Sequence, residues 1–126
     1  NGFKPDVIHS YGSYVEVFFA RLAEEGRPFH RPKCVGFGAD GMSDASRRLI
    51  EETFGIPVFS SYNAVEAWRL GFECERHTGI HINEDFYTLR IADGDGRTVP
   101  PGVPSDVVVS NLVNRAMVLL NYRLGD

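Results

Sequence analysis

Short β-prone runs alternate with helical patterns along the first half of the chain. The first run spans 6–10, and the segment after it repeats apolar residues at the three- and four-residue spacing of an amphipathic helix. These residues are Val15, Phe18, Phe19 and Leu22. Ser13 and Glu16 have the spacing of a capping box, and Gly26 stands where a helix stops. We therefore predict a strand followed by a helix whose apolar stripe faces a sheet.

The same alternation continues to Ser60. A second strand is predicted over 33–37 and a third over 56–60, with a helix between them that begins at Ser43 and ends at Gly55. The residues expected to face inward are Ala45, Leu49, Ile50 and Phe54. Those expected to face water are Arg47, Arg48, Glu51 and Glu52. Strands joined by single helices predict a parallel β-α-β-α-β layer of the α/β class.

The second half of the chain has a different pattern. The segment 66–73 fits a short helix and a strand equally well, but from Ile80 onward apolar and polar residues alternate with the period of antiparallel strands. Further strands are expected at 107–109 and 119–120, with a turn at 93–96. We therefore expect a parallel α/β part over 1–65 and a mainly antiparallel part over 66–126, together forming one structural fragment.

Composition and charge exclude several function classes. The chain has 126 residues, 43% of them hydrophobic, and a formal net charge of -4. It therefore has enough apolar residues for a core but no basic field to attract nucleic acid. The longest apolar run, Ala116 to Leu120, is too short to cross a membrane. Two cysteines make no disulfide framework, so a cytoplasmic location is expected.

Two segments that follow predicted strands are candidates for ligand binding, because parallel sheets bind ligands at the carboxyl ends of their strands. Gly38–Gly41 has small residues that admit a flat ligand, and Ser61–Glu66 places the aromatic Tyr62 four residues before the carboxylate of Glu66. Together these segments suit a nucleotide base and a cation. The alternative is structural, with glycines that only turn the chain and a Glu66 that begins a helix.

Four motifs resemble those of one enzyme family. They are Tyr-Asn-Ala-Val-Glu at 62–66, Gly-Ile-His-Ile-Asn-Glu-Asp at 79–85, Ser-Asn-Leu-Val-Asn-Arg-Ala-Met at 110–117 and Tyr-Arg-Leu-Gly-Asp at 122–126. Their order is similar to that in adenylate-forming enzymes, and the set resembles the phenylacetate-CoA ligase family with its CapK-like relatives. The resemblance extends from about Pro5 to the last residue. It implies a subdomain of the N-terminal domain of an adenylate-forming enzyme.

The resemblance also implies roles for individual residues. Tyr62 would stack on adenine, Glu66 would act in catalysis by holding Mg²⁺ against the phosphates, and Asp126 would accept hydrogen bonds from the ribose. The other nucleotide-binding positions implied are Gly38, Ala39, Asp40, Ser61 and Asn63. Asn63 and Val65 differ from the residues usual in the family, as do Val118 and Asn121, which leaves adenylation and acid specificity open to change.

A possible zinc half-site is a second implication. Cys74 and His81 match positions that, in some members of the family, bind zinc with two later cysteines. His77 lies close to both in the sequence. The alternative interpretation is a buried cysteine near two polar histidines.

The activity implied is that of an ATP-dependent, AMP-forming acid–CoA ligase, with ATP, Mg²⁺ and coenzyme A as cofactors and an aryl or other carboxylic acid as substrate. The 126 residues contain neither the phosphate loop nor the late lysine of such enzymes, so we expect an inactive middle fragment of an active parent. The rival interpretations are a non-catalytic nucleotide-binding or interaction module and a CapK-like protein of capsule biosynthesis. Faces exposed by excision would favour a homodimer.

Overall fold

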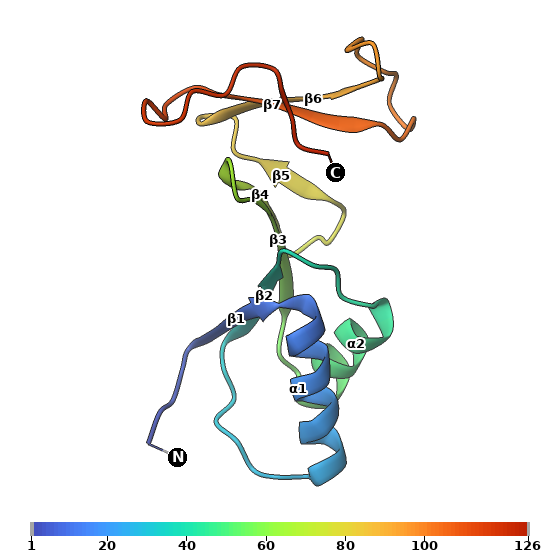
Figure 1. The fold of residues 1–126 in the computed structure, drawn as a ribbon. Helices are drawn as coiled ribbons and strands as arrows, with labels where there is room; N and C mark the ends of the chain where they lie inside the picture. The colour runs from blue at the N-terminus through green and yellow to red at the C-terminus, as the bar shows by residue number, and fades with distance from the viewer. Residues whose placement is uncertain (1, 126) are drawn as a thin grey trace. The chain divides into compact units, whose positions relative to one another are not determined.

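The computed structural model describes residues 2–125, in which the strands form two sheets and the helices pack on the first of them (Figure 1). The elements are β1 (Val7–Tyr11), α1 (Gly12–Glu25), β2 (Cys34–Gly38), α2 (Asp44–Arg48), a π-helical turn (Leu49–Thr53), β3 (Val58–Ala64), β4 (Trp68–Glu73), β5 (Ile80–Ile82), β6 (Tyr87–Ala92), β7 (Asp106–Asn111) and β8 (Tyr122–Arg123). The strand orders are β1-β2-β3-β4-β5 and β6-β7-β8.

The chain divides into two compact units. The first unit contains the residues up to Tyr62 together with Phe72–Ile80, and the second contains Asn63–Gly71 and the residues from His81 onward. The β3–β4 hairpin therefore contributes its base to the first unit and its tip to the second.

Parallel pairing of β1, β2 and β3 confirms the predicted β-α-β-α-β layer of the first unit. Helices α1 and α2 cover one face of these strands (Figure 1). The core between the two layers is apolar throughout. Its buried members are Val15, Phe19, Val35, Phe37, Ile50, Ile56 and Val58.

Helix α1 ends as the sequence predicts but begins differently. The N–H of Gly26, in the left-handed conformation, donates to the Leu22 carbonyl over 3.1 Å. The predicted capping box is wrong, because α1 starts directly after β1 and no side chain caps it from Tyr11. The predicted stripe is also too wide, since Phe19 is buried but Phe18 is 46% exposed.

The second helix has the predicted cap and a different set of inward residues. The Ser43 hydroxyl accepts a hydrogen bond from the Ser46 N–H at 3.2 Å, which confirms Ser43 as the N-cap. Ile50 is buried as expected, whereas Ala45 is exposed and Arg47 turns inward. In residues 2–125 we find no helix with the length and apolar character needed to span a bilayer.

The second unit is mainly antiparallel, as predicted. Strand β6 pairs with β7 along its length, and the Asp93 carboxylate closes the predicted turn by accepting the N–H groups of Asp95 and Arg97. The ambiguous segment 66–73 is a turn followed by β4. The strand expected at 119–120 is absent from the described residues, because the Leu119 carbonyl instead accepts the Asn111 N–H across a loop.

Candidate functional site

The carboxyl end of β2 lies beside the middle of β3 in the first unit. Phe37 pairs with Ser60 in the parallel register, so β2 ends at Gly38 close to the part of β3 that contains Ser61 and Tyr62. The Ser61 hydroxyl donates to the Phe37 carbonyl over 3.1 Å, and Ala39 has the left-handed φ of 70°. The structure therefore brings the predicted Gly38–Asp40 segment, at the end of β2, near Ser61 and Tyr62 within β3.

The Asp40 carboxylate has a structural partner at this edge. It accepts hydrogen bonds from the Ser13 hydroxyl at 2.5 Å and from the Ser13 N–H at 3.3 Å. The Ser13 hydroxyl bond is the main cause that holds the pKa of Asp40 below its usual range. Gly12 is required beside this contact, since a Cβ there would lie 2.3 Å from the Gly41 carbonyl oxygen. Asp40 thus holds the first turn of α1 against the loop that follows β2.

Glu16 holds the far end of the same loop. Its carboxylate accepts the Ser43 N–H over 2.5 Å, and that backbone hydrogen bond is the largest cause lowering the pKa of Glu16. The two residues predicted to cap their own helix, Ser13 and Glu16, therefore each bind a residue 27 positions later, Asp40 and Ser43. Tertiary partners replace the local capping box and fix the Gly38–Ser43 loop on α1.

Glu66 lies in the second unit, in the turn that connects β3 to β4. The Ala67 N–H donates to the Ala64 carbonyl over 3.2 Å, so Glu66 belongs to a turn and begins no helix. The Tyr122 hydroxyl donates to the Glu66 carboxylate at 3.4 Å. Two of the four motifs, which contain Glu66 and Tyr122, therefore meet within this unit. Asn63 also belongs to this unit, and Asp126 lies outside the described residues.

The motif at 110–117 builds a loop beside β7. The buried Asn111 side chain donates to the Met117 carbonyl at 2.5 Å, and the Asn114 side chain accepts the N–H groups of Ala116 and Met117. A hollow of about 490 Å³ opens on this loop. It is lined by Asn111, Leu112, Val113, Asn114, Arg115 and Val118. Both asparagines of the motif shape the backbone around this hollow.

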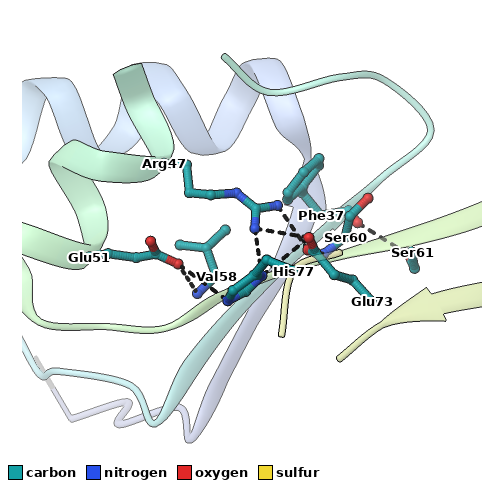
Figure 2. A network of polar contacts seen from close by, with 8 residues as sticks. All are labelled: Phe37, Arg47, Glu51, Val58, Ser60, Ser61, Glu73 and His77. Atoms are coloured by element: carbon teal, nitrogen blue, oxygen red, sulfur yellow. Dashed lines mark hydrogen bonds and ion pairs between the residues drawn. The ribbon is translucent and has the colours of Figure 1, made fainter. Parts of the chain in front are cut away.

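A partly buried polar network that the sequence did not reveal lies in the first unit (Figure 2). Arg47 binds the Glu73 carboxylate with two hydrogen bonds of 2.8 and 3.1 Å, and the Ser60 N–H donates to the same carboxylate at 2.8 Å. The His77 Nδ1 lies 3.1 Å from Glu73 and 2.8 Å from an Arg47 nitrogen. Arg47 was predicted to face water, but its side chain is only 19% exposed and that of Glu73 only 10%.

Burial and hydrogen bonding oppose each other at Glu73. Burial would raise the pKa of its carboxyl, but the hydrogen bonds from Arg47, the Ser60 N–H and His77 together hold the pKa below its usual range. The helix spacing of Arg47 and Glu51 suggested a solvated face, and no pattern in the sequence links Arg47 to Glu73. The pairing arises because folding places Glu73, the last residue of β4, beside Arg47 of α2.

The zinc half-site gains no support from the described residues. Across residues 2–125 no group of three or more His, Cys, Asp and Glu side chains is arranged to hold a metal ion. Cys74 is partly buried, His81 lies on β5, and His77 stacks on Phe59 with ring centroids 5.7 Å apart.

The fold is shared with enzymes that join acids to coenzyme A. Superposition on the crystal structure of 2-hydroxyisobutyryl-CoA ligase, in complex with 2-HIB-AMP and CoA, gives a TM-score of 0.79 at 19% identity. It covers 96% of this chain and 30% of the other. An anthranilate-CoA ligase in complex with anthranoyl-AMP gives 0.71 at 12% identity, over 96% of this chain and 23% of the other. The predicted fold class, that of adenylate-forming enzymes, is confirmed.

Sequence comparison points to a narrower relationship. The chain is 32% identical over 130 aligned positions to a phenylacetate-coenzyme A ligase of Pseudomonas putida, covering 98% of this chain and 30% of that protein. No family model matches the chain. The chain is thus related to the phenylacetate-CoA ligases, as its motifs predict, over a segment that spans about a third of the relative's length.

Proposed function

We propose that this chain is a part of an ATP-dependent, AMP-forming acid–CoA ligase similar to phenylacetate-CoA ligase. The observation that supports the proposal most strongly is the 32% identity to that enzyme over 98% of this chain. Of the rival interpretations, a non-catalytic nucleotide-binding module has the same fold but forms no acyl-adenylate. A cytoplasmic location belongs to the proposal, because ATP and coenzyme A are supplied there.

The proposed reaction has two steps. In the first, an oxygen of the substrate carboxylate attacks the α-phosphorus of ATP, the bond to the β-phosphate oxygen breaks, and pyrophosphate leaves. In the second, the thiol of coenzyme A attacks the acyl carbonyl, a thioester forms, AMP leaves with the electrons of the broken bond, and the thiol proton passes to solvent. Both steps depend on groups held in position and on neutralised phosphate charge.

Within the first unit, we assign the adenine to Tyr62 on β3 and to the segment Gly38–Asp40 at the end of β2. The left-handed turn at Ala39 and the small side chains around it suit close approach of a flat base. Ser61 positions the strand end through its bond to the Phe37 carbonyl. The Asp40 carboxylate already accepts the Ser13 hydroxyl. We therefore propose that Asp40 shapes the loop with its side chain and contacts the base with its backbone.

Within the second unit, we assign Mg²⁺ to Glu66, whose single described donor is the Tyr122 hydroxyl at 3.4 Å. A carboxylate has capacity for further contacts, and oxygen ligands suit a hard cation that would neutralise phosphate charge. Asn63 and Asp126 complete the proposed nucleotide-binding set, with Asp126 accepting from the ribose hydroxyls.

The proposal is tested by ATP–pyrophosphate exchange catalysed by the full-length protein across a panel of aryl and aliphatic carboxylic acids. We expect exchange that depends on one class of acid, and release of AMP when coenzyme A is added. Full-length protein that binds ATP but supports no exchange with any acid would favour the non-catalytic module.

Variants of Tyr62 separate stacking from general disruption. We expect Tyr62→Ala to raise the KM for ATP by about tenfold, since base–aromatic stacking contributes roughly 1–3 kcal/mol. Tyr62→Phe retains the ring and serves as the matched control, with a KM for ATP close to that of the unmodified protein. Equal KM values in Tyr62→Ala and Tyr62→Phe would remove Tyr62 from the adenine site.

A further inference from the structure

The network around Glu73 contacts the two strands, β2 and β3, that carry the residues assigned to adenine. Arg47 lies over the ring of Phe37, with its guanidinium carbon 5.7 Å from the ring centroid, and Phe37 immediately precedes Gly38 (Figure 2). Glu73 binds the N–H of Ser60, two residues before Tyr62. One partly buried ion pair therefore contacts β2 just before its end and β3 two residues before Tyr62.

Two carboxylates also bind backbone N–H groups of β3 ahead of Tyr62. Val58 and Ser60 pair with Val35 and Phe37 of β2, and the N–H groups of Val58 and Ser60 each donate to a carboxylate. Glu51 accepts the first over 3.3 Å and Glu73 the second over 2.8 Å (Figure 2). The backbone of β3 ahead of Tyr62 is thus held by side chains as well as by its pairing with β2.

We propose that the Arg47–Glu73–His77 network is a positioning device that holds the end of β2 and the part of β3 ahead of Tyr62 at the separation required to bind the adenine of ATP. The inference rests on the proposed function and adds residues that contact no substrate. Exposed ion pairs rarely position anything, since they are weak and mobile. This pair is bidentate, mostly buried and bonded to backbone, which restricts both partners to one geometry.

The test uses Glu73→Gln and Arg47→Lys in the full-length protein. Glu73→Gln keeps the shape but loses the charge, and we expect the KM for ATP to rise by about tenfold or more while the KM for the acid stays within about twofold. Arg47→Lys keeps a cation but loses the bidentate geometry, so a smaller rise in the KM for ATP is expected. This graded series remains informative even when Glu73→Gln folds poorly.

The matched control is Asp6→Asn, which breaks the exposed ion pair between Asp6 and Lys33. These two residues precede β1 and β2, at the ends of the strands away from the proposed adenine site. It should leave every kinetic constant unchanged. The Glu73 and Arg47 variants could lower the melting temperature and leave the KM for ATP unaltered. That result would show that the network only stabilises the fold, and it would overturn the proposal. An equal rise in both KM values would also overturn the proposal.

A second readout is independent of activity. Hydrogen exchange of the amides from Ser60 to Tyr62 should accelerate in Glu73→Gln and not in Asp6→Asn, because the carboxylate protects the Ser60 N–H. Unchanged exchange at these amides would refute the positioning role. Accelerated exchange in a full-length protein that forms no acyl-adenylate would refute the proposed enzyme function and leave the role of Glu73 in shaping the strand ends intact.

Discussion

The two units of the chain use different means to reach a defined structure. The first unit encloses a continuous apolar core between a parallel sheet and its helices. The second unit has fewer large buried side chains and leaves many apolar side chains on its surface. The exposed apolar residues of the second unit include Leu112, Val113, Met117, Val118 and Leu120. Side chains that bond to backbone, such as Asn111 and Arg123, fix its loops instead.

This difference indicates what holds the proposed binding residues in place within each unit. In the first unit, packing holds the strands, and polar contacts such as Asp40 with Ser13 only adjust the loops at their ends. In the second unit, the polar contacts themselves define the backbone of the 110–117 motif. We therefore expect apolar core substitutions to cause the largest losses of stability in the first unit. Substitutions of polar residues that bind backbone should matter relatively more in the second unit.

The largest effect is expected from Phe19→Ala in the first unit. Phe19 is fully buried and packs edge-on against Phe29 and Phe54, so its removal should cost about 3–5 kcal/mol of unfolding free energy. Phe18→Ala is the control. The Phe18 ring is half exposed, so its removal should cost about 1 kcal/mol or less of unfolding free energy. Urea unfolding measures both, and similar losses would contradict the assigned core.

In the second unit a large effect is expected from the polar residue Asn111. Asn111→Ala removes a buried side-chain bond to the Met117 carbonyl, which should cost about 1–3 kcal/mol and loosen the 112–118 loop. Asn114→Ala, in the exposed part of the same loop, should cost about 1 kcal/mol or less. Limited proteolysis of the loop provides the measurement, and faster cleavage in Asn114→Ala than in Asn111→Ala would reverse the ranking.

Acid should weaken the first unit through three carboxyls. The folded-state pKa values of Glu16, Asp40 and Glu73 are lowered, so their stabilisation is fully present well above the ordinary values of 4.5 and 3.8 and is lost as pH falls through the folded pKa values. Glu73→Gln should therefore differ from the unmodified protein less at about pH 3 than at about pH 7. Urea unfolding across this range checks the sign, and a difference that grows toward acid would refute it.

The smallest effect is expected at the cap of α2. Ser43→Ala loses the side-chain bond to the Ser46 N–H and should cost about 1 kcal/mol. Ser43→Asn keeps a capping side chain and should retain most of the stability. Thermal unfolding of the two variants gives the comparison, and equal melting temperatures would show that the cap contributes nothing measurable.

The sequence by itself determined the order of elements, the family resemblance and much of the core. Periodic apolar positions gave the strands and helices of the first unit because local spacing decides which face of an element is apolar. Gly26 and Ser43 were predicted correctly for the same reason, since stops and caps act within a few residues. The strand at 119–120 was predicted wrongly, because Leu119 is buried by a loop contact that has no periodic pattern.

Only the tertiary structure decided where the polar side chains of the first unit bind. Ser13 and Glu16 satisfy the local rule for a capping box, but a loop 27 residues away provides partners that fix two elements at once. Arg47 fits a solvated helix face until the end of β4 brings Glu73 beside it. Such partners are distant in the sequence, and a charge can be buried only where folding delivers its counter-charge.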